Sequence, residues 1–230
     1  MGMTKLASPS VADLEIDDQH LPRLRQRIVK RAFDLFVAIG ALVLLSPLLL
    51  GIAFAVAVSS RGSAFFLQQR IGRRGRPFRI IKFRTMVADA ASGSLETAGS
   101  SDPRITPIGH ILRRTKLDEL PQLLNVLIGN MSMVGPRPEI PFYASRYAGD
   151  ERLIFTVRPG ITDACSLELA DLDDRMDQRH GLTPGEFYER FILPRKKELQ
   201  IQYAHDLSFG NDLGVLWRTF WRVLRRWTGR

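Results

Sequence analysis

The longest apolar stretch of the chain runs from Leu35 to Val58 and contains no charged side chain. Its central part, VAIGALVLLSPLLLGIAFAVAV, is too long and too apolar for the core helix of a small soluble domain, because about 20 helical residues are enough to cross the apolar part of a bilayer. Ser46 and Pro47 lie in the middle of it. A proline inside a helix lacks a backbone donor and clashes with the preceding turn, so we expect a membrane helix that bends at this pair.

The other apolar positions form shorter segments, separated by glycine, proline and polar residues. Between residues 65 and 84, glycines and a proline interrupt short apolar pieces, which predicts a hairpin or extended strands. Residues 88–103 are small and polar and are expected to form a loop. Apolar residues with helical spacing follow at residues 107–114, 118–128, 183–204 and 213–227. The pattern predicts an α+β fold that is mostly helical with a small β-hairpin.

The last apolar segment has an aromatic face. Trp217, Phe220, Trp221 and Leu224 recur at steps of three and four residues, and Trp227 continues the series, so they share one side of a helix. The arginines of this segment lie mostly off that side. Such a helix suits the plane of a membrane interface, and it equally suits packing against the chain's own domain.

The charge pattern indicates how the membrane helix is placed. The formal net charge of +9 requires an acidic partner, such as anionic lipid head groups, phosphorylated substrates or nucleic acid. Basic residues flank the apolar stretch on both sides, and no acidic residue occurs between Ser59 and Ala88. Because basic flanks favour the cytoplasmic face, we expect a re-entrant helix-break-helix that enters and leaves on one face. A straight span is the alternative.

The sequence divides into three expected parts. Residues 1–22 are polar and small and are expected to be a mobile tail. Residues 23–60 hold the basic flank and the re-entrant helix, and residues 61–230 are expected to be one catalytic domain on the cytoplasmic face that ends in the amphipathic helix. Cys165 is the only cysteine, so no intrachain disulfide can form, which fits a reducing compartment.

Two adjacent carboxylates, Asp118 and Glu119, are the candidate catalytic residues. Pro121 is tolerated only in the first turn of a helix, which places the pair at or near a helix N-terminus. Two carboxylates this close need a counter-charge, and Mg²⁺ held at Asp118 together with substrate phosphates would supply it. A carboxylate can also attack phosphorus and form an acyl phosphate. The alternative is that the pair only complements the helix dipole.

Many basic residues precede and follow this pair, and they are suited to binding phosphate oxygens by charge-assisted hydrogen bonds. Stiff proline-containing turns occur at residues 135–138 and 158–160, and each contributes charged candidates. The candidate substrate-binding residues are Arg84, Arg104, Arg113, Arg114, Lys116, Arg137, Glu139 and Arg158. Basic groups around a carboxylate nucleophile would stabilise the charge of a phosphoryl transfer.

Three stretches resemble the bacterial sugar transferase family, the monotopic phosphoglycosyl transferases that begin glycoconjugate and exopolysaccharide synthesis. They are QQRIGRRGRPFRIIKFRTM, DPRITPIGHILRRTKLDELPQLLNVLIGNMSMVGPRPE and VRPGITD, and with the apolar stretch they cover most of residues 28–165. The resemblance implies a re-entrant helix that breaks at Ser46-Pro47. It also implies a location at the bacterial inner membrane, with the catalytic domain on the cytoplasmic face, and a requirement for Mg²⁺.

The resemblance further implies a reaction. Asp118 would attack the sugar-linked phosphate of a nucleotide diphosphate sugar, usually a UDP-sugar, so that a nucleoside monophosphate leaves and a phosphosugar stays on the enzyme. A polyprenol phosphate, typically undecaprenyl phosphate, would then accept the phosphosugar. Glu119 would assist by positioning or proton handling. Arg84, Arg113 and Arg137 match basic family positions suited to phosphates.

The chain departs from the family after the PGIT sequence. Many members continue with a glycine and WAQV, whereas this chain has Asp163 followed by ACSLELADLDD, which leaves the choice of sugar open. Thr115-Lys116 also replaces the commoner threonine-serine before the carboxylate pair. The sequence does not fix the oligomeric state, and a homodimer is left open.

Two other functions agree with parts of the pattern. A non-catalytic membrane adaptor for a polysaccharide assembly complex explains the charge and the apolar segments. It does not explain why carboxylates, arginines and stiff turns converge between residues 84 and 139. Nucleic acid is not an expected partner, because few aromatics interrupt the basic run and a membrane segment lies beside it.

Overall fold

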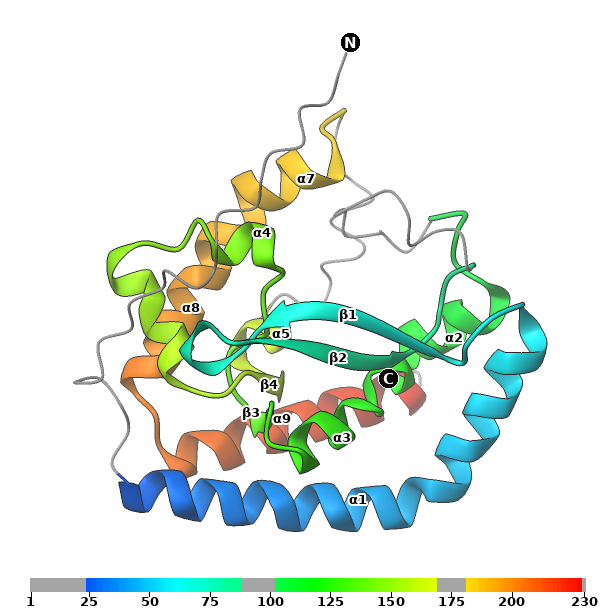
Figure 1. Cartoon of the computed structure of the whole chain (residues 1–230), viewed down its shortest axis with the longest axis horizontal. Coiled ribbons are helices and arrows are strands. Elements are labelled where there is room, and N and C mark those ends of the chain that lie inside the picture. Colours follow the sequence, from blue (N-terminus) through cyan, green and yellow to red (C-terminus); the bar gives the residue numbers. More distant parts are fainter. Residues whose placement is uncertain (1–23, 88–101, 169–180, 229–230) are drawn as a thin grey trace.

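The structure, a computed structural model, describes residues 24–87, 102–168 and 181–228. The expected tail at residues 1–22 and most of the expected loop at residues 88–103 lie outside these ranges. Within them the chain is mostly helical, with a two-stranded antiparallel hairpin and one long apolar helix (Figure 1). The coarse fold that the sequence predicts is therefore confirmed.

Helix α1 (Leu24–Ser59) contains the whole apolar stretch. It is the one helix in the described ranges that is long and apolar enough to cross a membrane. Figure 1 shows a long lower arm and a shorter rising arm that meet at a bend. Pro47 lies inside the helix, and the Ser46 hydroxyl donates to the Val43 carbonyl at 2.8 Å. The backbone donor that Pro47 lacks accounts for a bend in a helix of this length.

Both arms of α1 pack against the same body of the molecule. Ala38 of the first arm shares a buried cluster with Val126 of α3 (Gln122–Leu127). Val56 of the second arm shares another cluster with Leu112 of α2 (Pro107–Thr115). Away from this body, large apolar side chains of α1 stay exposed, among them Phe36, Val43, Leu44, Leu50 and Phe54.

Strands β1 (Phe65–Ile71) and β2 (Pro77–Phe83) form the antiparallel hairpin that the sequence predicts. A tight 3₁₀ turn (Arg73–Gly75) joins them, with left-handed backbone at Arg74 (φ 58) and Gly75 (φ 67). In the register Phe66 lies opposite Lys82, so both side chains point to the same face of the hairpin. This register directs the side chain of Lys82 toward the turn between α2 and α3.

A second, parallel strand pair was not predicted from the sequence. Strand β3 (Ser132–Val134) lies beside β4 (Gly160–Thr162). Just beyond β3, Gly135 approaches Gly160 so closely that a Cβ on Gly160 would lie 2.1 Å from the Gly135 nitrogen. Only glycine permits this contact, which fixes the start of the turn at residues 135–138. Short helices α4 (Pro141–Ala144) and α5 (Ala164–Glu168) follow the two strands, with a 3₁₀ segment (Gly149–Thr156) between them.

The C-terminal part is helical, as the periodicity predicts. Helix α7 (Pro184–Phe187) continues through a π-helical turn (Tyr188–Ile192) into α8 (Leu193–His205), and Pro194 lies in the first turn of α8, where a proline is tolerated. Helix α9 (Phe209–Thr228) packs through Val215 on the strand pair. Trp217, Phe220 and Trp221 stay exposed, so these three aromatic side chains are not covered by the described part of the chain.

Candidate active site

Asp118 and Glu119 lie in a 3₁₀ turn (Leu117–Glu119) between α2 and α3. Lys116, which has a left-handed backbone (φ 59), ends α2 and redirects the chain into this turn. Pro121 is the N-cap of α3. The pair therefore directly precedes a helix start, close to the place that Pro121 predicts.

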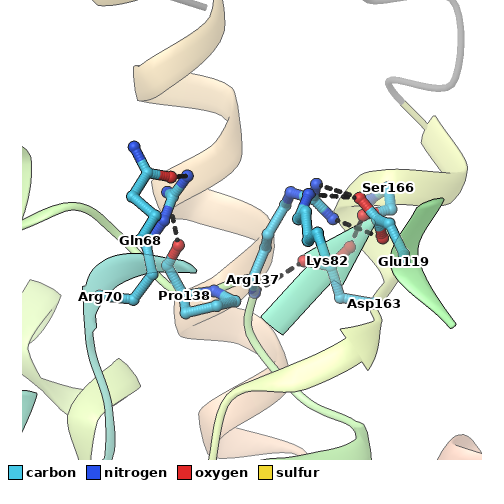
Figure 2. A network of polar contacts seen from close by, with 8 residues as sticks. All are labelled: Gln68, Arg70, Lys82, Glu119, Arg137, Pro138, Asp163 and Ser166. Carbon is cyan, nitrogen blue, oxygen red and sulfur yellow. Dashed lines mark hydrogen bonds and ion pairs between the residues drawn. The ribbon is translucent and has the colours of Figure 1, made fainter. Parts of the chain in front are cut away.

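Two cations bind the carboxylate of Glu119. The Lys82 ammonium donates to Glu119 Oε1 at 2.9 Å, and the Arg137 guanidinium donates to Oε1 at 2.7 Å and to Oε2 at 3.4 Å (Figure 2). Burial alone would raise the pKa of Glu119, but the charges of Arg137 and Lys82 outweigh it and hold this pKa well below its usual range. Glu119 is therefore an ionised anchor for two cations.

Asp118 has the opposite surroundings. Its side chain is buried, and its Oδ1 atom has no hydrogen-bond partner within the described part of the chain. Burial, with the neighbouring charge of Glu119, raises the pKa of Asp118 to about 6. An unpartnered carboxylate oxygen is costly in a folded protein, and it is also free to act as a nucleophile or a metal ligand.

The backbone of Arg137 is bound from both sides. Its N–H donates to the Asp163 carboxylate at 3.0 Å, and its carbonyl accepts from the Gln200 amide of α8 at 3.2 Å. Pro138, which follows it, accepts from the Arg70 guanidinium at 3.1 Å. Figure 2 shows Arg137 between Gln68 and Arg70 of the hairpin and the Glu119 carboxylate. The turn at residues 135–138 therefore holds the guanidinium at the carboxylate pair.

Three more of the expected basic residues come from the segment just before the pair. The charges of Lys116 and Arg113 lower the pKa of Asp118 and partly offset its burial, so both act on the carboxylate pair. Arg114 is exposed near the end of α2.

The other expected substrate-binding residues have different contacts. Arg84 donates to the carbonyls of Ser60 and Arg61, where α1 ends. Arg158 donates to the Gly129 carbonyl, and Arg104 pairs with the Asp102 carboxylate. The Glu139 carboxylate binds Lys196 and Tyr147. The structure thus brings Arg137, Lys116 and Arg113 to the carboxylate pair and gives these four residues structural partners.

Sequence reasoning did not select Lys82, Asp163 or Gln200 for this site. Lys82 lies in β2 and Arg84 directly follows this strand, and the sequence pattern offered no means of choosing between these two basic residues. Asp163 had a signal, because it replaces the glycine that many family members have after PGIT. Gln200 had none, since one polar residue in an amphipathic helix does not indicate what it contacts.

The residues present are compatible with one Mg²⁺. Within the described ranges, no group of three or more His, Cys, Asp or Glu side chains is placed to hold a metal ion. The unpartnered Oδ1 of Asp118 is nevertheless a suitable ligand, because Mg²⁺ is commonly held by one or two carboxylates together with substrate phosphates and water. Asp118 would therefore hold the ion jointly with a phosphorylated substrate.

A carboxylate pair with bound cations thus lies on a helical body that also includes one long apolar helix. The model of the bacterial sugar transferase family matches residues 25–226. The chain belongs to this family.

Individual relatives agree with this assignment. A UDP-galactose-lipid carrier transferase of Erwinia amylovora is 34% identical over 97% of this chain and 46% of its own length. A UDP-glucose:undecaprenyl-phosphate glucose-1-phosphate transferase of Caulobacter vibrioides is 37% identical over 86% of this chain and 71% of its own length. An Escherichia coli protein of the same name is 45% identical over 59% of this chain and 30% of its own length. The chain thus spans about half the length of the Erwinia relative.

Proposed function

We propose that this protein transfers a sugar 1-phosphate from a UDP-sugar to undecaprenyl phosphate and releases UMP. The observation that supports this most directly is the buried Asp118 carboxylate, with an unpartnered oxygen, beside a Glu119 that is held by Lys82 and Arg137. The names of the Caulobacter and Escherichia relatives describe the same transfer for glucose 1-phosphate.

The proposed reaction has two displacements at one phosphorus atom. A carboxylate oxygen of Asp118 forms a bond to the sugar-linked phosphorus, while the bond from that phosphorus to the bridging oxygen breaks and UMP leaves with the electron pair. A phosphate oxygen of undecaprenyl phosphate then attacks the same phosphorus. The Asp118 carboxylate leaves with its electrons, and the product is an undecaprenyl diphosphate sugar.

Glu119 and its two cations would prepare the site for this charge. Because the pKa of Glu119 is depressed, it stays ionised and is unsuited to accept a proton at neutral pH. It instead holds the Arg137 guanidinium and the Lys82 ammonium next to Asp118, where both would stabilise the negative charge that develops on the phosphoryl oxygens. A Mg²⁺ held by Asp118 and the substrate diphosphate would add Lewis-acid polarisation of the phosphoryl group.

We propose a re-entrant placement of α1 on the cytoplasmic face, supported by how both ends of the helix are attached. Near its start, the Lys30 ammonium binds the Asp212 carboxylate of α9 at 2.5 Å. At its end, Arg84 binds the Ser60 carbonyl at 2.8 Å. As a straight helix its 36 residues would measure about 54 Å, well over the roughly 30 Å of a bilayer core. Two ends fixed to one compact body belong on one side of a membrane.

Purified protein in detergent, given Mg²⁺, undecaprenyl phosphate and a panel of UDP-sugars, tests the reaction by UMP release. We expect release with one sugar, its loss in EDTA, and its loss in Asp118→Asn, which keeps the side-chain shape. Glu198→Gln removes a carboxylate from an exposed position of α8 and should leave the rate unchanged. UMP release by Asp118→Asn at the wild-type rate would refute the assignment of Asp118.

A second arm of the experiment tests the covalent intermediate. Without undecaprenyl phosphate, the wild type should release about one UMP per enzyme and retain the labelled phosphosugar on the protein. Direct transfer between the two substrates predicts no UMP without the acceptor. An adaptor without catalytic activity predicts no UMP in either arm, while Asp118→Asn would keep its partner interactions.

A further inference from the structure

One face of α8 contacts the segment from the end of β3 to the residue after the 135–138 turn. Lys196, Gln200 and Tyr203 follow each other at steps of four and three residues, so they lie on one side of the helix. Their partners run in the opposite direction along the chain. Lys196 binds the Glu139 carboxylate, Gln200 donates to the Arg137 carbonyl at 3.2 Å, and Tyr203 donates to the Val134 carbonyl at 3.2 Å.

The contact at Arg137 differs from the other two because a second side chain, that of Asp163, binds the N–H of the same residue. Asp163 is buried and accepts the Arg137 N–H at 3.0 Å. Prolines on both sides of Arg137 restrict its backbone further, since each fixes one φ angle and provides no donor. Both hydrogen-bonding groups of this residue's backbone are thus bound by side chains from distant segments.

Gln200 makes this contact and leaves its own side-chain oxygen unpaired among the described residues. The residue is 1% exposed, and its Oε1 atom is buried with no hydrogen-bond partner in the described part of the chain. Leaving a buried acceptor unpaired costs about 1–3 kcal/mol. An apolar side chain of the same size would avoid that cost, but it would leave the Arg137 carbonyl without its donor.

We propose that Gln200 and Asp163 are positioning residues that place the Arg137 guanidinium at Glu119 by binding the Arg137 carbonyl and N–H. This inference rests on the proposed function, because Arg137 is taken to stabilise the transferring phosphoryl group. It extends the active site to α8 and to the position at which this chain has aspartate where many family members have glycine.

The test is a double-mutant cycle on UMP release. Gln200→Leu keeps the volume and removes both the donor to Arg137 and the unpaired Oε1, so the thermal midpoint should change little. We expect kcat to fall about tenfold, with the KM for the UDP-sugar within about threefold of wild type, because a small displacement of a catalytic group affects mainly the transition state. In an Arg137→Lys background, Gln200→Leu should lower kcat by less than about twofold, since the guanidinium to be positioned is gone.

Tyr203→Phe is the matched control on the same helix face. It removes the hydroxyl whose one proton the Val134 carbonyl and the Asp212 carboxylate share, so it should lower the thermal midpoint while kcat stays within about twofold of wild type. If Gln200→Leu lowers kcat equally in both backgrounds, or if Tyr203→Phe lowers it as much, α8 acts through general stability and the proposal is wrong.

Hydrogen exchange separates this proposal from the proposed function, because it needs no substrate. In Asp163→Ala the amide of Arg137 loses its side-chain acceptor, so this amide should exchange at least tenfold faster while that of Val134 changes little. Unchanged exchange at Arg137 would overturn the positioning role whether or not the wild type releases UMP. Faster exchange in a protein that releases no UMP would support the positioning and refute the proposed reaction.

Discussion

Asp118 and Glu119 are neighbours in the chain but have opposite electrostatic surroundings. Lys82 and Arg137 bind Glu119, whereas the Oδ1 atom of Asp118 has no hydrogen-bond partner in the described part of the chain. Adjacency alone made this pair a candidate from the sequence. It did not say which carboxylate would be held and which left free, because that depends on Lys82 and Arg137, which are distant in the sequence.

Asp118→Asn should stabilise the protein above pH 6. Since burial raises the pKa of Asp118 from 3.8 to about 6, the folded state binds a proton more tightly than the unfolded state. Stability should therefore fall as pH rises from about 4 to 6, by about 3 kcal/mol for two pKa units, and stay lower above that. Thermal unfolding without Mg²⁺ should show the asparagine variant more stable at pH 8 and nearly equal to wild type at pH 4.

Glu119→Gln is the contrasting control for this prediction. It removes the counter-charge of two partly buried cations, so it should destabilise the protein by about 2 kcal/mol at pH 8, a value reduced for the solvent exposure of Arg137. If both variants change stability in the same direction, the opposite surroundings of the two carboxylates are not the cause.

At the scale of secondary structure, the sequence predicted the elements with a clear period. Glycines and a proline between short apolar pieces indicated the hairpin of β1 and β2, and the spacing of apolar residues indicated α2, α8 and α9. The strands β3 and β4 have three residues each, too few to show an alternating pattern. They exist because Gly135 and Gly160 allow two backbones to touch, a tertiary contact that no local pattern reports.

Arg84 illustrates how an element's contacts revise a residue's expected role. It was expected to bind phosphate, as a family position suited to that purpose. In the structure its guanidinium binds carbonyls at the end of α1, where helix carbonyls lack partners within the helix. The sequence showed a basic residue at a matching position, but the partner of that residue is set by where α1 ends in space.

Arg84→Met should therefore lower stability more than activity. It leaves the carbonyls at the end of α1 without their donor, which predicts a loss of about 1–3 kcal/mol in the free energy of unfolding. The kcat/KM for the UDP-sugar should stay within about fivefold of wild type. A large loss of kcat/KM with an unchanged thermal midpoint would instead favour the phosphate-binding role. Arg137→Met, measured in parallel, should lose activity.

At the scale of the whole molecule, α1 and the body above it form one unit. The Lys30–Asp212 ion pair joins the start of α1 to α9, and the rings of Phe33 and Phe209 meet edge to face at 5.1 Å. The active site is built on the same body, through α3 and the turn before it. The height of Asp118 above α1 is therefore fixed by packing rather than by a flexible linker.

This arrangement predicts the accessibility of both ends of α1. In Gln26→Cys and in Ser63→Cys, neither new thiol should react with an impermeant maleimide added to intact spheroplasts, and both should react after permeabilisation. Cys165 should contribute little background, because it is buried and burial raises its pKa to about 12. Labelling of only one of the two thiols in intact spheroplasts would indicate a straight span.

The ion pair between Lys30 and Asp212 also has a consequence for how the protein is made. Its two residues are 182 positions apart, so at about 5–20 residues per second the ribosome produces the aspartate roughly 10–40 s after the lysine. Asp34 is likewise synthesised before Ser132, whose hydroxyl donates a hydrogen bond to it in the folded protein. Helix α1 is thus synthesised before the segments that carry its polar partners, so a nascent chain released before α9 would hold Lys30 without Asp212 and would leave the charge of this lysine to Asp34 of the same helix.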